Sequence, residues 1–302
     1  MTSPPGTALV TGATGFIGRA LVPALLAHGW DVAAGSRHTK HASPTQGVHW
    51  LTFDLLQPES FDTAFEGVKV AYYLVHSMGD HQADFRTREL RAARAFAQAA
   101  ERAGVERIVY LGGPAPPVGA SEHLRSRSEV GEVLRAGKVP TVELRASMVI
   151  GHGSASWQIV RDLALRLPVM VLPKWLSSRT RPIALDDVVA ALVAAAEVPI
   201  ERNEWFDVPG PETMDGQQIL ERIAALGGRH FIALKVPFLT PRLSSLWLRL
   251  VTRTDYAVAR ELVMGLTSDL LPHDERFWSL IGHTELVSFD EAARRALAAE
   301  RA

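Results

Sequence analysis

The sequence predicts an α/β fold, a doubly wound parallel sheet followed by a smaller, mostly helical C-terminal region. In the first half of the chain, short apolar runs alternate with segments of helical periodicity. This is the pattern of strands and crossover helices in a parallel sheet. The stretch VTGATGFIGRA then spaces Gly12, Gly15 and Gly18 three residues apart, between the first apolar run and the first helical run.

The alternation predicts six strands and the helices between them, in chain order. The expected strands are 7–12, 31–37, 48–55, 68–75, 105–113 and 140–149. The expected helices are 15–29, a short one at 58–67, 84–104 and 122–137. Beyond Gly151 the pattern changes, and we interpret 154–173 as a helix followed by a loop. A helix at 182–199 follows, which Asp186 or Asp187 could cap, then a strand at 204–212 and a mostly helical remainder.

Composition excludes several classes of protein. The chain has 302 residues, of which 47% are hydrophobic and 22% charged, so a large core is expected and disorder is not. The net charge of −1 gives no general attraction to nucleic acid. The absence of cysteine excludes disulfides and thiolate chemistry and fits a cytoplasmic protein. The start of the chain does not have the pattern of a secretory signal, and no apolar run has the length of a membrane span.

The glycine stretch has the chemistry of a dinucleotide-binding turn. Gly12 suits the sharp turn after the strand, Gly15 lets a diphosphate approach the backbone, and Gly18 lets the helix pack closely on the strand. The helix N-terminus offers N–H groups and a partial positive charge to phosphate. We therefore expect Gly12, Thr14, Gly15, Phe16, Ile17 and Gly18 to bind a cofactor. A structural turn in a domain without a nucleotide is the alternative reading.

The spacing of TGATGFIG resembles that of the extended and atypical short-chain dehydrogenase/reductase family, which includes NmrA-like and NAD-dependent epimerase-like proteins. The resemblance covers nearly the whole chain. Within the family, the chain is similar to uncharacterised bacterial NAD(P)H-binding proteins. It implies a Rossmann fold in which Asp54 and Leu55 contact the adenine and the strand end at Val75 and His76 borders the cofactor. The LRASMVIGHGS stretch resembles the loop that closes over the nicotinamide, which adds Ala146 and Met148.

These patterns also predict the division of the chain. We expect residues 1–150 to form the NAD(P)-binding Rossmann domain and 151–302 the C-terminal substrate or lid region. Residues 181–210, which include a stretch similar to the family's DDV helix, are expected to return to the first domain.

The end of the second strand predicts which dinucleotide is preferred. A carboxylate at this position binds the ribose hydroxyls of NAD, whereas arginine accommodates the 2′-phosphate of NADP. The chain has Ser36 and Arg37 there and no acid. We therefore expect NADP(H) to be preferred over NAD(H), with a solvated loop arginine as the alternative reading.

The family's usual catalytic pair is a Tyr-x-x-x-Lys on the helix after the fifth strand, and this chain departs from it. The matching positions are His123 and Arg127, one helical turn apart. No tyrosine lies between residues 111 and 255. His123 could serve as a general acid or base whose pKa the nearby Arg127 depresses. Arg127 could instead bind the cofactor, and both residues could be purely structural.

Three functions remain open on the sequence alone. The first is an NADP(H)-dependent oxidoreductase that acts on a small substrate. The basic residues Lys174, Arg179 and Arg181 would suit an anionic substrate. The second is a non-catalytic NADPH-binding redox sensor or structural subunit, and the third, less favoured, is a nucleotide-sugar-type epimerase. The expected partners are a small-molecule substrate and, as an open alternative, a second copy of the chain.

Residues 76–84 and 243–250 contain two further patterns, which leave these three functions unchanged. The histidines and aspartates at 76–84 match no zinc spacing, so we expect no metal. The apolar positions between 243 and 250 have helical spacing, which indicates a core or lid helix, with membrane-surface or partner binding as the alternative.

Overall fold

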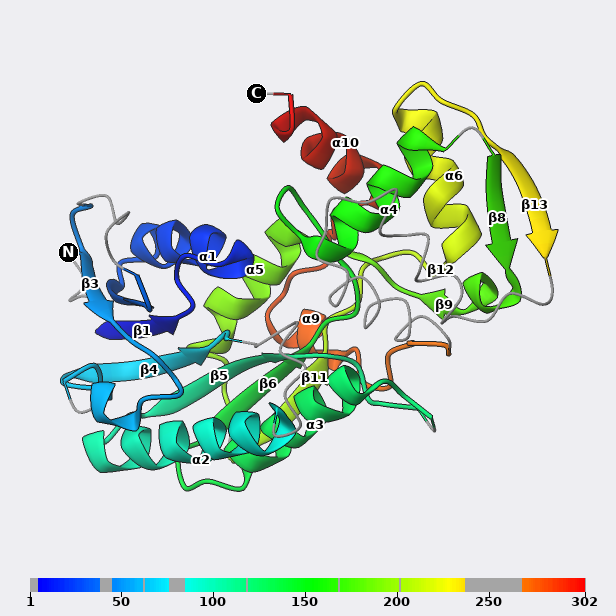
Figure 1. Cartoon of the computed structure of the whole chain (residues 1–302). Helices are drawn as coiled ribbons and strands as arrows, with labels where there is room; N and C mark the ends of the chain where they lie inside the picture. The colour runs from blue at the N-terminus through cyan, green and yellow to red at the C-terminus, as the bar shows by residue number, and fades with distance from the viewer. Residues whose placement is uncertain are drawn as a thin grey trace.

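The computed structural model of the chain describes residues 5–38, 45–61, 63–75, 85–117, 119–167, 169–200, 202–236 and 268–301. These residues form a seven-stranded sheet with helices on both faces and a smaller second lobe beside it (Figure 1). The α/β class and the doubly wound sheet predicted from the sequence are confirmed.

The main sheet is parallel throughout, in the order β11-β6-β5-β4-β1-β2-β3. Its strands are β1 (Thr7–Thr11), β2 (Asp31–Ser36), β3 (Val48–Thr52), β4 (Val68–Tyr73), β5 (Arg107–Gly112), β6 (Thr141–Arg145) and β11 (Glu204–Asp207). From β1 the chain builds outward first through β2 and β3 and then, on the other side, through β4. The direction therefore reverses at β1, and the carboxyl edge of such a sheet has its ligand crevice at that reversal.

Two pairs of helices cover the sheet, and alternating strand residues divide between them. On one face, α1 (Phe16–Ala27) and α5 (Leu185–Ala195) pack on a core that includes Ala8 and Val10. On the other, α2 (Phe85–Ala103) and α3 (Glu122–Arg135) pack on a core that includes Leu9.

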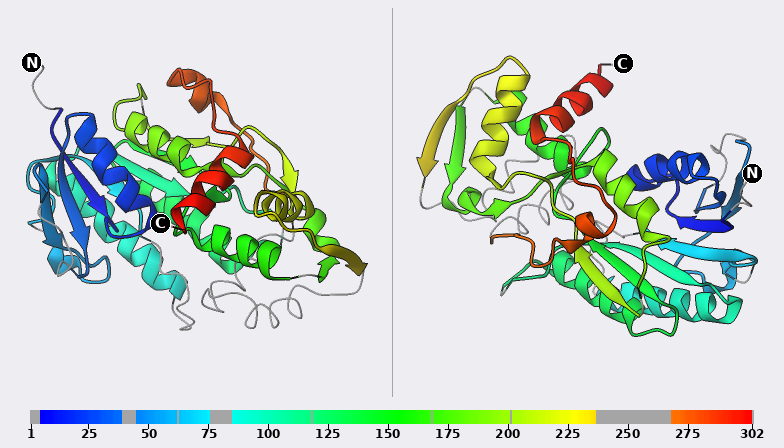
Figure 2. Two further views of the ribbon diagram at one scale, coloured as in Figure 1. Left: turned by 90° about the horizontal axis from the view of Figure 1, so that it is seen from above. Right: turned by 180° about the vertical axis from the view of Figure 1, so that it is seen from behind.

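The described residues of the second lobe include helices packed beside a short parallel sheet, which the right-hand view of Figure 2 shows from behind. Its helices are α4 (Ala155–Arg166), α6 (Gly216–Leu226) and α10 (Phe289–Ala299), and its parallel strands are β8 (Val169–Pro173) and β13 (Ile232–Val236). The fully buried Trp157 and the nearly buried Ile219 and Phe289 lie in its core. Shorter elements join it to the sheet. They are β7 (Val149–Ile150), η2 (Lys174–Ser177), β9 (Arg179–Thr180), β10 (Ile183–Ala184), β12 (Met214–Asp215) and α9 (Arg276–Leu280).

Three local predictions were wrong. The short helix expected at 58–67 is a single 3₁₀ turn, η1 (Pro58–Ser60). The loop expected after α4 is strand β8, because β13 pairs with it from more than fifty residues further along the chain. Neither Asp186 nor Asp187 caps α5, whose N-cap is Ala184, since both carboxylates bind the C-terminal segment instead.

Within the described ranges, no helix combines the length and apolar character that crossing a bilayer requires.

Candidate functional site

A cavity of about 870 Å³ lies at the carboxyl ends of β1 to β4, where the sheet order reverses. It is lined by the glycine turn, the end of β2, the segment after β3 and the end of β4. Its lining residues are Gly12, Ala13, Thr14, Gly15, Arg19, Ser36, Arg37, His38, Thr45, Trp50, Phe53, Asp54, Leu55, Leu56, Tyr73, Leu74, Val75, Glu89 and Ala92. Eight of the residues predicted to bind a cofactor are among them.

The glycine turn has little room for side chains. Gly12 has φ +66°, a conformation that other residues rarely adopt. A Cβ on Gly15 would lie 3.1 Å from the Gly12 carbonyl oxygen, and one on Gly18 would lie 2.4 Å from the same oxygen. Both glycines therefore let α1 begin directly against the turn.

The start of α1 is open to an anion. Gly15 is its N-cap, and within the described part of the chain no side chain caps this end. The first helical hydrogen bond runs from the Arg19 N–H to the Gly15 carbonyl at 3.0 Å, so the preceding N–H groups of the first turn have no helical acceptor. This end of α1 borders the cavity, and the arrangement fits a diphosphate.

The end of β2 brings hydroxyl and basic groups into the same cavity. The hydroxyls of Thr14 and Ser36 lie 3.2 Å apart, and the Ser36 hydroxyl also accepts from the His38 N–H at 3.3 Å. Arg37 and His38 are exposed, and both line the cavity. The rim at this point is therefore basic, which suits a phosphate group.

Two cavity residues escaped the sequence analysis. Arg19 follows Gly18 and stands one turn after Gly15, so its side chain reaches the cavity from the start of α1. The sequence signal that could have identified Arg19 is its spacing of one helical turn from the turn glycine Gly15. Glu89, in α2, is a buried carboxylate in the cavity wall, and the helical pattern around it gave no signal that it faces a ligand site.

Asp54 uses its carboxylate locally. One oxygen accepts from the Leu56 N–H at 3.0 Å, and the other accepts from the Gln57 side-chain amide at 3.2 Å. The carboxylate therefore fixes the turn after β3, and that turn holds the buried Leu55 in the cavity wall.

Other predicted cofactor residues do not line this cavity. Phe16 packs against Gly151, where a Cβ would lie 3.0 Å from its ring, and Ile17 packs into the core between α1 and the sheet. Ala146 and Met148 are nearly buried after β6, with the Ala146 N–H bonded to the Gly112 carbonyl at 3.2 Å. His76 lies outside the described residues.

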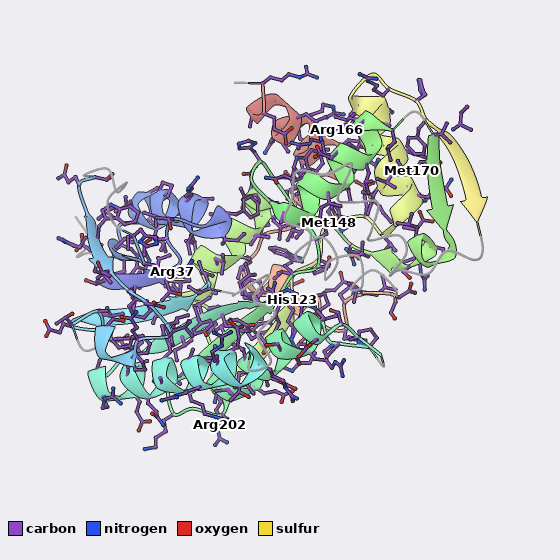
Figure 3. All side chains as sticks on the ribbon, in the orientation of Figure 1. Arg37, His123, Met148, Arg166, Met170 and Arg202 are labelled. Carbon is purple, nitrogen blue, oxygen red and sulfur yellow. The ribbon has the colours of Figure 1, made fainter. Side chains whose placement is uncertain are left out.

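His123 and Arg127 lie one helical turn apart on α3. Figure 3 shows His123 at the start of this helix, well away from Arg37. The Arg127 guanidinium donates through Nη2 to the Leu111 carbonyl at 3.0 Å. The Arg127 carbonyl accepts from the Tyr110 hydroxyl at 2.9 Å. Burial, and then the positive charge of Arg127, lower the pKa of His123 to about 4. At neutral pH this imidazole is uncharged.

The three described tyrosines are core residues. Burial raises the pKa of the Tyr72, Tyr73 and Tyr110 hydroxyls above the ordinary value. The Tyr72 hydroxyl donates to the Leu192 carbonyl at 3.1 Å, on the opposite face of the sheet from α3. Within the described residues, therefore, none of the tyrosines takes the position of a catalytic acid.

Two of the basic residues considered for an anionic substrate are ion-paired, Arg179 with Asp269 at 2.7 Å and Arg181 with Glu275 at 2.6 Å. Their charges are thus partly neutralised. Nothing is described for the Lys174 side chain, for 76–84 or for 243–250. In the ranges that the structure does describe, no group of three acidic or histidine side chains has the arrangement of a metal site.

Comparison with curated proteins gives three relatives, all distant. A ceramide reductase of Caulobacter vibrioides is 30% identical over 65% of this chain and 62% of its own length. Sterol demethylase protein B of Methylococcus capsulatus is 38% identical over 34% of this chain and 33% of its length. Subunit 9 of the mouse NADH dehydrogenase 1 alpha subcomplex is 24% identical over 76% of this chain and 63% of its length. The chain thus spans less than two thirds of each relative.

Solved structures share the fold over nearly the entire chain. The triphenylmethane reductase of Citrobacter sp., complexed with NADP(H), has a TM-score of 0.76 at 18% identity and covers 96% of this chain and 99% of that one. MoeE5, complexed with UDP-glucuronic acid and NAD, has a TM-score of 0.75 at 18% identity and covers 98% and 99%. These similarities show a common fold.

The family model described as NAD(P)H-binding matches residues 12–199, which include the glycine turn, the end of β2 and helix α3. The predicted resemblance to the atypical short-chain dehydrogenase/reductases is confirmed by this match and by the structural neighbours. The chain belongs to this NAD(P)H-binding family.

Proposed function

We propose that the chain is an NADP(H)-preferring oxidoreductase that reduces a carbonyl group on a small, largely apolar molecule. The observation that carries the proposal is the cavity at the glycine turn, with Arg19, Arg37 and His38 in its lining. When bound, a reduced nicotinamide supplies a hydride, and the protein supplies orientation and exclusion of water.

The basic rim supports the preference for NADP(H). The 2′-phosphate carries negative charge that an NAD-type carboxylate would repel. Strand β2 ends at Ser36 and Arg37 follows it, so no such acid stands there. We assign Arg37 and Arg19 to the 2′-phosphate, and the N-terminus of α1 to the diphosphate. The nicotinamide end then runs along the carboxyl edge toward α3 and the loop containing Ala146 and Met148.

The relatives support an apolar substrate. Two of the three carry names that refer to lipids, a ceramide and a sterol. We place the substrate of this chain between α3 and the C-terminal region, and residues 151–302 serve there as the substrate or lid region, with 181–210 packed back onto the sheet.

The test begins with binding. Purified protein is titrated with NADPH and NADH by nicotinamide fluorescence, and we expect NADPH to bind at least about tenfold more tightly. Absorbance of the reduced nicotinamide is then followed with long-chain ketones, cyclic sterol-like ketones and, for comparison, nucleotide sugars. Oxidation of NADPH by an apolar ketone supports the proposal. Equal affinities contradict the cofactor preference, and tight binding with no ketone reduced contradicts the reductase activity.

A second candidate is a non-catalytic NADPH-binding subunit or sensor. The replacement of the family's tyrosine by a histidine that is uncharged at neutral pH favours it, as does the relative named as a subunit of NADH dehydrogenase. This candidate predicts that NADPH binds without turnover and raises the melting temperature.

A further inference from the structure

The cavity at the glycine turn matches the adenosine half of a dinucleotide. Its lining includes that turn and the end of β2, which we assign to the diphosphate and the 2′-phosphate. Arg127, Ala146 and Met148, which stand toward the expected nicotinamide end, are not part of its described lining. Since the 2′-phosphate is carried by the adenosine ribose, the rest of the cavity is where the attached base would lie.

The rest of the cavity wall is mostly apolar. Phe53 and Leu55, which follow β3, and Tyr73, the last residue of β4, line it and are buried. Ala92 of α2 lines it as well and is also buried. These four side chains belong to one core cluster, so the wall they form is fixed by packing. Such a wall suits the apolar faces of a purine ring.

One buried carboxylate interrupts this apolar wall. Glu89 lines the cavity, is 7% exposed and stands three residues before Ala92, so both lie on the same side of α2. Burial raises the pKa of the Tyr73 hydroxyl and the charge of Glu89 raises it further, so these two groups are neighbours. Burying a carboxylate is costly unless it accepts hydrogen bonds. Its two oxygens offer about four acceptor positions, so a bond to a protein group leaves others for a ligand.

The described lining contains one other acid, Asp54, and it serves its own loop. Each of its two oxygens accepts a hydrogen bond from the turn after β3, one from the Leu56 N–H and one from the Gln57 side chain. Asp54 is also only half-buried, whereas Glu89 is buried in the wall. Of the two acids, Glu89 is therefore the one whose burial calls for a ligand partner.

We propose that Glu89 selects the base of the cofactor by accepting a hydrogen bond from the 6-amino group of adenine. The proposal rests on the proposed binding of NADP(H) in this cavity and is independent of the reductase step. An ionised carboxylate accepts hydrogen bonds and cannot donate them, so it pairs with the N–H groups that adenine carries at position 6. A base without that amino group leaves the buried carboxylate with an unmet acceptor, and sites of this kind discriminate strongly.

The test uses ligands that carry no nicotinamide, so it needs no turnover. Adenosine 2′,5′-bisphosphate is compared by calorimetric titration with purine riboside 2′,5′-bisphosphate, in which hydrogen replaces the 6-amino group. We expect the wild type to bind the adenosine ligand at least about tenfold more tightly, because the other ligand lacks a hydrogen bond to a charged group. A ratio of affinities near one in the wild type overturns the proposal.

Two substitutions assign the preference to Glu89. Glu89→Leu removes the acceptor, so we expect the two ligands to bind within about twofold of each other. Glu89→Gln keeps an acceptor oxygen without the charge, so we expect an intermediate preference of about threefold. Glu101→Gln, at an exposed position of the same helix, is the matched control and should leave the ratio unchanged. A residue that only stabilised the fold would weaken both ligands equally, and an unchanged ratio in Glu89→Leu overturns the proposal.

Asp54→Asn separates the two acids of the cavity. We expect the preference for the adenosine ligand to persist in this variant, because the carboxylate of Asp54 holds its own turn. A preference that is lost in Asp54→Asn and kept in Glu89→Leu would assign the base to the loop after β3 and overturn the role of Glu89.

The role of Glu89 and the reductase function fail in different ways. If NADPH binds and no ketone is reduced, the reductase function is contradicted, while the ratio of the two bisphosphates still decides the role of Glu89. If a ketone is reduced but the wild type shows no preference for the 6-amino group, the reductase function stands and the role of Glu89 is contradicted. If neither bisphosphate binds, the assignment of this cavity to the cofactor fails together with the role of Glu89.

Discussion

The hydroxyl of Tyr110, in β5, donates a 2.9 Å hydrogen bond to the backbone carbonyl of Arg127, in α3. Arg127 returns the contact through Nη2, which donates to the carbonyl of Leu111 in the same strand. The sheet and the helix are thereby joined at Arg127, one helical turn after His123. This reciprocal link fixes where the charge of Arg127 stands relative to the carboxyl edge.

Tyr110→Phe tests that link. Phenylalanine fills the same space in the buried aromatic cluster but leaves the Arg127 carbonyl without this donor, so we expect unfolding to become easier by about 1 kcal/mol. Tyr72→Phe removes a similar buried hydrogen bond on the opposite face. Urea unfolding should show similar losses for both variants, whereas only Tyr110→Phe should shift the NMR titration of His123. An unchanged titration in Tyr110→Phe would mean that the bond does not position the helix.

Gly131→Ala tests how α3 packs on β6. A Cβ at this position would lie 2.5 Å from Oε2 of the buried Glu143, whose carboxylate is held by Arg135 and Arg145. Alanine favours helix by about 1 kcal/mol over glycine, yet we expect a net loss of about 1–3 kcal/mol because the carboxylate must move. Ser128→Ala, on the same helix, is the control for a general effect of helix substitution. A Gly131→Ala variant more stable than the wild type in urea would show that Glu143 can move without cost.

Much of the fold is predictable from the sequence because its signals are local. The glycine turn and the apolar runs around it specify β1, α1 and the crevice at the reversal point without reference to distant residues. What escaped prediction depends on long-range partners. Strand β8 exists because β13 pairs with it, and Asp187 binds the His283 ring and the Val287 N–H instead of capping its helix.

The residues of the site also divide into those that local sequence predicts and those that depend on long-range packing. Thr14, Ser36 and Arg37 follow from position in the turn and at the end of β2, and the cavity includes all three. Arg19 and Glu89 enter the same cavity from two helices, and which face of a helix meets a ligand depends on how that helix docks. The state of His123 depends on burial and on a fixed neighbour, which helix spacing indicates only in part.

Gly18→Ala should disrupt the cofactor cradle more than Gly15→Ala. A Cβ on Gly18 would meet backbone atoms at 2.4 and 2.6 Å, whereas one on Gly15 would meet its nearest neighbour at 3.1 Å. We expect Gly18→Ala to weaken NADPH binding by at least about tenfold and to cost about 1–3 kcal/mol of stability, because the first turn must shift. Gly104→Ala, at a positive-φ glycine with open space around it, is the control and should leave NADPH affinity unchanged. If fluorescence titrations show equal losses of NADPH affinity in Gly18→Ala and Gly15→Ala, Gly18 is not the more tightly packed of the two glycines.

Arg37→Ala should separate the two dinucleotides. The side chain lies on the cavity rim, and its loss removes a charge-assisted contact that only the 2′-phosphate of NADP would make, so we expect NADPH affinity to fall by about tenfold or more. NADH affinity should change little. Arg202→Ala removes an exposed charge far from Arg37 (Figure 3), and it controls for net charge. Equal losses for NADPH and NADH in Arg37→Ala would refute the assignment to the 2′-phosphate.

The neutral state of His123 also predicts how stability depends on pH. In the unfolded chain this histidine regains an ordinary pKa near 6.5, whereas in the folded chain the pKa is about 4. Between these values the unfolded state binds more protons, so the free energy of unfolding falls as the pH is lowered. The loss from this group should reach about 2 kcal/mol near pH 5. His123→Gln removes the titrating group, so its unfolding free energy should depend less steeply on pH between about 7 and 5 than that of the wild type. Parallel curves for the two proteins in urea unfolding would mean that His123 titrates alike in the folded and unfolded states, which would contradict the lowering of its pKa by burial and by Arg127.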